Sequence, residues 1–279
     1  MTTRVDNETA AVSLPAGGRE TELGGALIVN ADDWGRNAET TDRILECIRA
    51  GAVSSTSAMV FMEDSGRAAG LAREFGVDAG LHLNLTTPFS EAHCPPPLRE
   101  RQQQICGYLS RHSMARLIFN PWLSKVFSYV VAAQLEEFSR LYGAGPNRID
   151  GHHHMHLCAN VLRGELLPEG TIARRNFTFQ AGEKSLGNRL YRRHLDRKLA
   201  RRHRLTDFFF QLTPLEPRER LQRIFSLARH MVVEVETHPV HPQEYAFLAG
   251  GEIFRCAGEV PVSARFLFRQ PQHARNRDE

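Results

Sequence analysis

The chain has 279 residues, of which 42% are hydrophobic and 24% are charged, and its formal net charge is +3. This composition is typical of a soluble globular protein, and the length suits one α/β barrel domain. The weak positive charge does not indicate nucleic-acid binding, and no apolar run approaches the roughly 18–20 residues of a transmembrane helix.

Residues 1–24 are polar and lack the apolar segment of a secretory signal. We expect them to be a flexible extension, followed by a single domain over residues 25–270 and a flexible tail over residues 271–279. The five cysteines are scattered and form no CxxC pair, which indicates free thiols in a reducing compartment. We therefore expect a cytoplasmic protein.

Strand and helix patterns alternate over the first part of the chain. Residues 25–32 form a near-continuous apolar run, which predicts a strand buried on both faces. A helix pattern over 37–53, a strand over 54–61, a helix over 63–76 and a strand over 78–86 follow. This order predicts a parallel sheet with right-handed crossovers.

The second part of the chain begins with residues 87–104, where Pro88 and the prolines at 95–97 predict a long loop. Residues 101–143 are expected to be helical throughout, with Trp122 in the apolar stripe. Strands are predicted over 147–158, 206–213 and 231–242, the last running into a loop. A helix is predicted over 214–230.

Asp32 and Asp33 come at the end of the first predicted strand. Neighbouring strand residues point to opposite faces, so both acids serve one pocket only if the strand ends between them and the chain turns. Gly35 permits such a turn. A divalent metal ion would relieve the repulsion of the acids, with one acid as ligand and the other free as a base. Alternatively, this segment could simply cap the helix near Asn37.

Two more predicted strands end in residues of the metal-ligand type. His82 and Asn84 end one strand, and His238 and His241 follow another. Taken alone, His82 is more often a hydrogen-bonded core residue than a ligand, and His238 could be an exposed loop residue. A histidine near a metal is suited to general acid catalysis, because its pKa lies near neutrality.

The segment IDGHHHMH carries four histidines within five residues, after Asp150 and Gly151. If the strand continues through them, His152, His154 and His156 share one face, and Asp150 is in phase to orient one imidazole. The carboxyl ends of parallel strands converge on one edge of a sheet. The sequence therefore favours a mixed nitrogen and oxygen site for one divalent metal ion. Zn²⁺ is favoured, with Mg²⁺ or another divalent first-row metal as the alternative.

The segment 189–204 is strongly basic, with leucines interleaved among its arginines. A solvated helix face is the common form of such a segment. A peripheral contact with anionic lipid headgroups is the alternative.

The motifs LIVNADDWG, GAVSSTSAMV, AGLHLNLT, IDGHHHMHL and ETHP occur in this order, and together they resemble the YdjC-like carbohydrate deacetylases. The resemblance spans about residues 26–262, and the basic segment with the chain's last motifs is most similar to the hopanoid-biosynthesis-associated (HpnK) branch. It implies an irregular (β/α) barrel related to the polysaccharide deacetylases (NodB-like). It also implies metal-dependent removal of the acetyl group from an N-acetylated sugar, with a glycolipid such as a hopanoid glycoside as the more specific substrate.

The resemblance also implies roles for individual residues. The metal ligands would be Asp33, His82 and His152, the general base Asp32 and the general acid His238. The predicted substrate-binding residues are Arg174, with Arg175 as the alternative, Trp34, which stands where phenylalanine is usual, and Asn84. Asp150, His154 and His156 are left as supporting residues or additional ligands.

Two alternative functions follow from the same residues. The site could hydrolyse another bond, such as a phosphoester, or the chain could be a non-catalytic module that binds sugars or a membrane surface. No nucleic-acid partner is expected, and a homodimer is left open.

Overall fold

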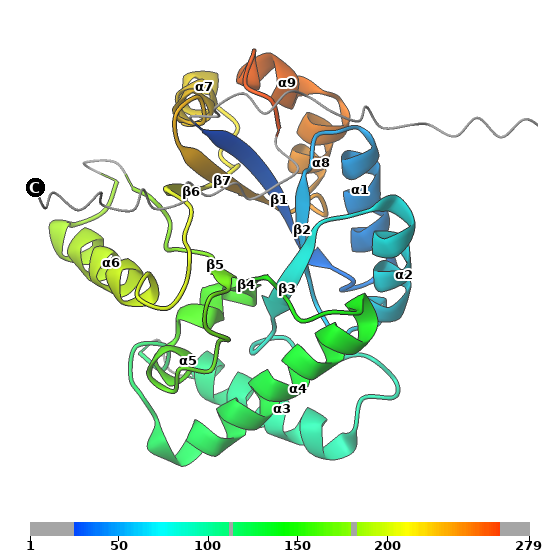
Figure 1. Cartoon of the computed structure of the whole chain (residues 1–279), viewed down its shortest axis with the longest axis vertical. Helices are drawn as coiled ribbons and strands as arrows, with labels where there is room; N and C mark the ends of the chain where they lie inside the picture. The colour runs from blue at the N-terminus through cyan, green and yellow to red at the C-terminus, as the bar shows by residue number, and fades with distance from the viewer. Residues whose placement is uncertain (1–24, 112–113, 180–182, 263–279) are drawn as a thin grey trace, which may run out of the picture.

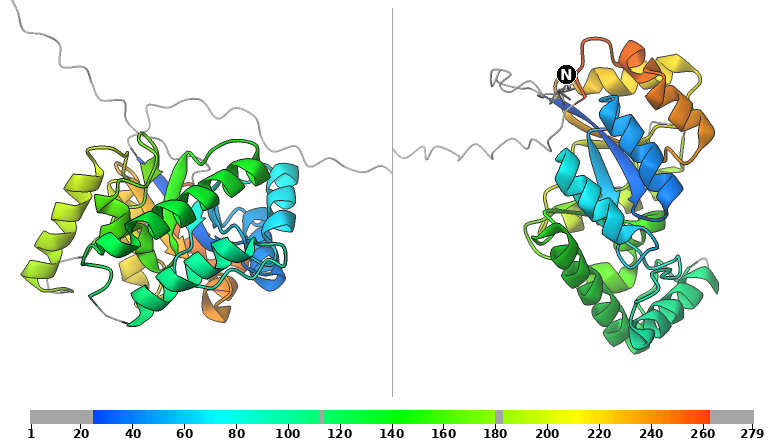
Figure 2. Two further views of the ribbon diagram at one scale, coloured as in Figure 1. Left: turned by 90° about the horizontal axis from the view of Figure 1, so that it is seen from below. Right: turned by 90° about the vertical axis from the view of Figure 1, so that its right-hand side faces the viewer.

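Seven parallel strands form the centre of the molecule, in the spatial order β5-β4-β3-β2-β1-β7-β6 (Figure 1). This computed structural model of the chain describes residues 25–111, 114–179 and 183–262. The sheet curls into an incomplete barrel with helices around its outside (Figures 1 and 2), so the predicted α/β barrel is confirmed. The strands are β1 (Ala26–Trp34), β2 (Ser55–Ala58), β3 (Ala79–Leu83), β4 (Arg148–Gly151), β5 (Ile172–Ala173), β6 (Phe208–Gln211) and β7 (Val232–Thr237).

The helices connect these strands and cover the outer face of the sheet. All six predicted strands are present, and only β5, which is two residues long, had no sequence signal. The helices are α1 (Ala38–Arg49), α2 (Ser65–Phe75), α3 (Pro96–Arg111), η1 (Pro121–Leu123), α4 (Ser124–Tyr142), η2 (His152–Leu157), α5 (Ala159–Arg163), α6 (Leu186–Leu199), α7 (Arg218–Leu227), α8 (Pro242–Ala249) and α9 (Glu252–Ala257).

The prediction of one continuous helix over 101–143 is wrong. Helix α3 ends at Arg111, and the chain becomes helical again only at η1 and α4. Trp122 is 87% exposed instead of lying in an apolar stripe. The predicted proline-rich loop is also shorter than expected, because α3 begins at Pro96. Proline is tolerated there, since the first turn of a helix leaves its N–H groups without helical partners.

Alternate residues of each strand face two different environments. The outward side chains of β1, Leu27, Val29 and Ala31, belong to the main apolar core between sheet and helices. The positions in between on β1 include Asn30 and Asp32. The Asn30 amide donates to Asp32 on the same strand and to Ser57 on β2. The interior of the half-barrel is therefore polar, and the prediction of a first strand buried on both faces is confirmed, because every residue of β1 is buried.

The predicted domain limits extend beyond the described part of the chain. The extension 1–24 and the tail 271–279 lie outside the described residues. The limits of the single domain at 25 and 270 stay a prediction.

Candidate metal centre

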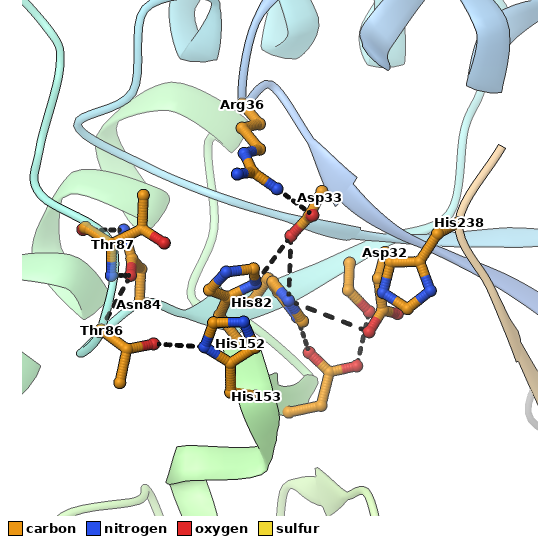
Figure 3. A network of polar contacts seen from close by, with 12 residues as sticks. Asp32, Asp33, Arg36, His82, Asn84, Thr86, Thr87, His152, His153 and His238 are labelled. Carbon is orange, nitrogen blue, oxygen red and sulfur yellow. Dashed lines mark hydrogen bonds and ion pairs between the residues drawn. The ribbon is translucent and has the colours of Figure 1, made fainter. Parts of the chain in front are cut away.

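Four strand ends meet at one edge of the half-barrel and supply the candidate site (Figure 3). β1 contributes Asp32 and Asp33, and β3 contributes His82. His152 follows β4 directly, and His238 follows β7. Because the strands are parallel, their carboxyl ends lie together.

Asp33 itself, and not a turn after Asp32, brings the two acids to one pocket. Its φ is +69°, in the left-handed region that non-glycine residues rarely adopt. Strand β1 continues to Trp34 across this residue, and its register with β2 shifts between Ala31 and Trp34. The alternative role as a helix cap is taken by Asn37, whose side chain accepts from the Thr40 N–H at 2.9 Å.

Asp33, His82 and His152 form a buried cluster whose ligand atoms all lie within 4.8 Å of one another. Asp33 Oδ1 is 3.4 Å from His82 Nε2 and 2.9 Å from His152 Nδ1. Neither Asp33 Oδ1 nor His82 Nε2 has a hydrogen-bond partner within the described structure. Buried polar atoms without partners are costly, and a divalent cation would satisfy both. These three residues therefore fit a metal ion.

Asp150 fixes the orientation of the His82 ring. The two residues are register partners on β4 and β3, and Asp150 Oδ1 accepts from His82 Nδ1 at 2.8 Å. This contact leaves Nε2, the ring nitrogen without a hydrogen-bond partner, directed toward Asp33. Burial lowers the pKa of His82, but the carboxylates of Asp32 and Asp150 outweigh it and raise the pKa to about 10. The surroundings of this imidazole thus favour positive charge.

The histidine cluster does not continue strand β4, contrary to the prediction. β4 ends at Gly151, and η2 begins at His152 with left-handed backbone at His153 and His154 (φ +53° and +58°). The three predicted histidines therefore do not share a face, and neither His154 nor His156 joins the cluster of possible ligands. His156 is buried and donates through Nε2 to the Arg174 carbonyl at 2.9 Å. His153 turns away to contact Thr86 Oγ1 at 3.0 Å.

Asp32 is paired, in contrast to the free carboxylate expected from the sequence. Both of its oxygens accept from the Arg174 guanidinium at 2.7 Å, and Oδ1 also accepts from the Asn30 amide at 2.8 Å. Burial raises the pKa of Asp32, but Arg174 and then His82 lower it more, so the carboxylate stays charged. Oδ2 keeps one acceptor site without a hydrogen bond and lies 3.8 Å from His82 Nε2.

Arg174 lies inside the half-barrel and uses all of its donors on carboxylates. Its guanidinium contacts Asp32 twice, and it also contacts Asp150, Glu234 and Glu236 at 2.7, 2.7 and 3.2 Å. A guanidinium has five N–H donors, so none is left for a sugar. The predicted substrate-binding role is therefore not supported, and we assign Arg174 to holding the acids. Arg175 faces away from the site and pairs with Asp196.

Trp34 and Asn84 are also buried away from the site opening, each with an exposed fraction of 0%. The Trp34 indole donates to the Ala68 carbonyl at 3.2 Å. The Asn84 amide oxygen accepts from the Thr86 and Thr87 N–H groups, which fixes the loop after β3 (Figure 3). Burial argues against direct sugar contact by either residue: Trp34 belongs to the main apolar core, and Asn84 holds the loop after β3.

His238 lies on the other side of Asp32 from the cluster (Figure 3). Ligand-type atoms of His238, Asp32 and Glu236 lie within 4.8 Å of one another, and the His238 side chain is 21% exposed. Its backbone N–H donates to Glu244 Oε2 at 2.6 Å, which fixes the chain as it leaves β7. The imidazole is thus positioned at the boundary between the buried acids and solvent.

Two buried glutamates of β7 were missed at the sequence level. Glu234 and Glu236 are 2% and 4% exposed and contact Arg174 inside the half-barrel. The alternation in VEVET was the available signal, but alternating acids on a strand usually mark a solvent-facing side. That side of β7 faces the interior here, because the sheet curls into a half-barrel.

A pocket of about 410 Å³ is lined by His153 and His154, which directly follow the cluster residue His152 in the chain. Its lining also includes Tyr191, Arg192 and Leu195 of α6, together with Leu117. The lining combines apolar, amide and cationic side chains. Such a pocket suits a ligand that carries both polar and apolar groups.

An open α/β barrel of seven parallel strands, with acids and histidines at its strand ends, fits the class of NodB-like barrels. Consistent with this class, the model of the family described as "YdjC-like protein" matches residues 26–259. The chain therefore belongs to the YdjC-like family. No helix in the described ranges is long and apolar enough to cross a membrane.

Curated relatives match a more limited part of the chain. A chitooligosaccharide deacetylase of Proteus mirabilis is 36% identical over 137 residues, covering 49% of this chain and 52% of that protein. One of Escherichia fergusonii is 34% identical over 137 residues, with the same coverage. The chain thus spans about half the length of the curated relatives it matches.

A solved structure shows the same fold. A protein of Enterococcus faecalis V583, provisionally described as a cellobiose-phosphate cleavage protein, superposes with a TM-score of 0.62 at 20% sequence identity. The match covers 85% of this chain and 95% of that one.

Proposed function

We propose that the protein is a metal-dependent hydrolase that removes the acetyl group from an N-acetylated amino sugar. The cluster of Asp33, His82 and His152 carries this proposal, because two of its facing ligand atoms are buried without partners. The family and the similarity to chitooligosaccharide deacetylases support acetyl-sugar chemistry. We favour Zn²⁺ as the ion, since a site of two imidazoles and one carboxylate suits it.

The residues around the cluster divide the proton transfers between them. A divalent ion bound there would supply Lewis-acid activation of a water molecule and of the acetyl carbonyl. Asp32 would accept the proton of the attacking water at Oδ2, the oxygen with a remaining acceptor site, while Arg174 holds the carboxylate in place. His238 would donate a proton to the departing sugar amine. The proton is needed because the sugar nitrogen would otherwise leave as an anion, which is a poor leaving group.

Removing a ligand tests the proposal most directly. We expect Asp33→Ala and His152→Ala to lose both the bound metal and acetate release from an N-acetylated chitooligosaccharide. His230→Ala, at an exposed position, is the matched control and should keep both. Full acetate release by either ligand variant would refute the assignment, and release of phosphate from a sugar phosphate would favour the phosphoester alternative.

We further propose that the acetylated sugar is carried by a lipid and that the protein acts in the cytoplasm. The resemblance to the hopanoid-associated branch and the apolar part of the pocket lining, which includes Leu117 and Leu195, support a glycolipid. A lipid-linked N-acetylglucosamine is expected to have a lower KM than the free sugar. Equal KM values for both substrates would argue against the lipid.

A further inference from the structure

Helix α6 presents an unusual outer face at the edge of the molecule (Figure 1). Leu186, Leu190, Arg193 and Arg197 follow one another at spacings of four, three and four, so they form one stripe along the helix. All four are exposed, with fractions of 64% for Leu186 and 53% for Leu190. The stripe is thus apolar in its first half and cationic in its second half.

The opposite side of α6 is already occupied by the fold. Asp196 and Leu199 are buried, and Asp196, the single acid of this helix, pairs with Arg175 and accepts from Asn176. No carboxylate among the described residues pairs with Arg193, Arg197 or Lys198. The outer face therefore has a net positive charge that the described residues do not compensate.

A second exposed apolar segment lies across the pocket from α6. Met114, Leu117 and Ile118 are 53%, 44% and 56% exposed, and Leu117 lines the same pocket as Tyr191 of α6. These two segments hold six of the nine large apolar side chains that the described residues expose. Exposed apolar groups gathered in one place mark an interaction surface.

We propose that α6 and residues 114–118 form a face that docks onto an anionic lipid bilayer. Leu186, Leu190 and the 114–118 segment enter the boundary of the acyl chains, while Arg193, Arg197 and Lys198 contact lipid phosphates. A bilayer matches both halves of the stripe, because its anionic headgroups lie directly above its apolar interior. The inference deepens the proposed function and rests on it for the purpose of docking, because both segments contribute to the pocket that His153 and His154 also line.

Vesicle co-sedimentation of the full chain tests this face without any turnover. We expect binding to vesicles of phosphatidylcholine with phosphatidylglycerol, little binding to phosphatidylcholine alone, and release by salt. Each basic side chain near such a surface strengthens binding about fivefold, so Arg193→Gln/Arg197→Gln is expected to weaken it roughly 25-fold. Leu186→Ser/Leu190→Ser is expected to weaken it roughly tenfold or more. Arg223→Gln/Arg229→Gln, which removes two exposed arginines on and after α7, should bind like the native chain.

Two further measurements separate the possible outcomes. Acetate release from soluble N,N′-diacetylchitobiose should be unchanged in the α6 variants, since none of the substituted residues lines the pocket. If the native chain binds anionic vesicles but releases no acetate, the docking inference stands and the proposed function fails. Vesicle binding that is unaffected by both α6 variants would overturn the docking inference. So would a native dimer that these variants convert to monomers without any vesicle binding, because the face would then be a self-association surface.

Discussion

Asp32 and Asp33 are adjacent in sequence but differ in their chemical surroundings. Asp32 is clamped by Arg174 deep in the half-barrel, and Asp33 pairs at 2.9 Å with Arg36, whose side chain is 38% exposed. Asp33 keeps one oxygen without a hydrogen-bond partner, next to two imidazoles. The left-handed backbone of Asp33 produces this difference. Strain of this kind is found at functional sites, where the surrounding structure maintains it.

Asp32→Asn tests the proposed division of roles between the two acids. We expect the variant to keep its metal, because Asp32 is not in the Asp33–His82–His152 cluster. Acetate release should fall by about 10²–10⁴-fold, the usual contribution of a positioned general base. Metal analysis and an acetate assay on the same preparation check both parts. Loss of the metal together with activity would instead make Asp32 a ligand.

Arg174→Met is expected to destabilise the protein by about 3–5 kcal/mol, because it leaves several buried carboxylates without their cation. Urea unfolding of the two proteins at neutral pH measures the difference. Arg175→Met is the matched control, since Arg175 pairs with a single carboxylate among the described residues, that of Asp196, and otherwise donates to the Thr206 and Asp207 carbonyls. The fall in its free energy of unfolding should therefore be smaller. An equal fall in the free energy of unfolding for the two variants would contradict the central role of Arg174.

The candidate ligands could be anticipated from the sequence, whereas their supporting partners could not. Strand-end positions place Asp33 and His82 at one edge of a parallel sheet, whereas the choice of His152 among the histidines was implied only by the resemblance to the YdjC-like family. In contrast, nothing in IARRNF tells which of two adjacent arginines enters the barrel. That choice depends on the pairing of β5 with β4, and β5 has only two residues.

At the scale of elements, the junction of β4 and η2 controls the position of His152. The alternating histidines suggested a longer strand, but Gly151 lies against the following helix. A Cβ added to Gly151 would lie 2.8 Å from the backbone nitrogen of His156 and 3.1 Å from the Cβ of His156. Close packing of this kind depends on tertiary structure, which explains why periodicity alone misplaced the end of the strand.

Gly151→Ala is therefore expected to displace η2 and with it His152. Overpacking typically costs about 1–3 kcal/mol, and a disturbed ligand typically weakens metal binding about 10–100-fold. Zinc titration calorimetry and urea unfolding measure the two effects. Gly66→Ala in α2 is the control, because no atom lies within 4 Å of its added Cβ. Unchanged zinc affinity in Gly151→Ala would show that η2 tolerates the shift.

At the scale of the whole molecule, the polar interior makes stability depend on pH. His156 is fully buried at the base of this interior, and its Nδ1 has no hydrogen-bond partner in the described structure. Burial lowers the pKa of His156 to about 4, from the usual 6.5. The unfolded chain therefore binds a proton between these two values that the folded chain does not bind.

Stability is consequently expected to fall as the pH drops from 6.5 toward 4, because protons bind preferentially to the unfolded chain. The His156 contribution amounts to roughly 3 kcal/mol at the lower end of this range. Urea unfolding of the chelator-treated protein across this pH range measures it against His156→Gln, whose amide can still donate to the Arg174 carbonyl but does not titrate. The variant should lose less stability on acidification than the native chain, while His230→Gln, at an exposed site, should behave like the native chain. Equal pH dependence in the native chain and in His156→Gln would show that other buried groups, and not His156, cause the loss.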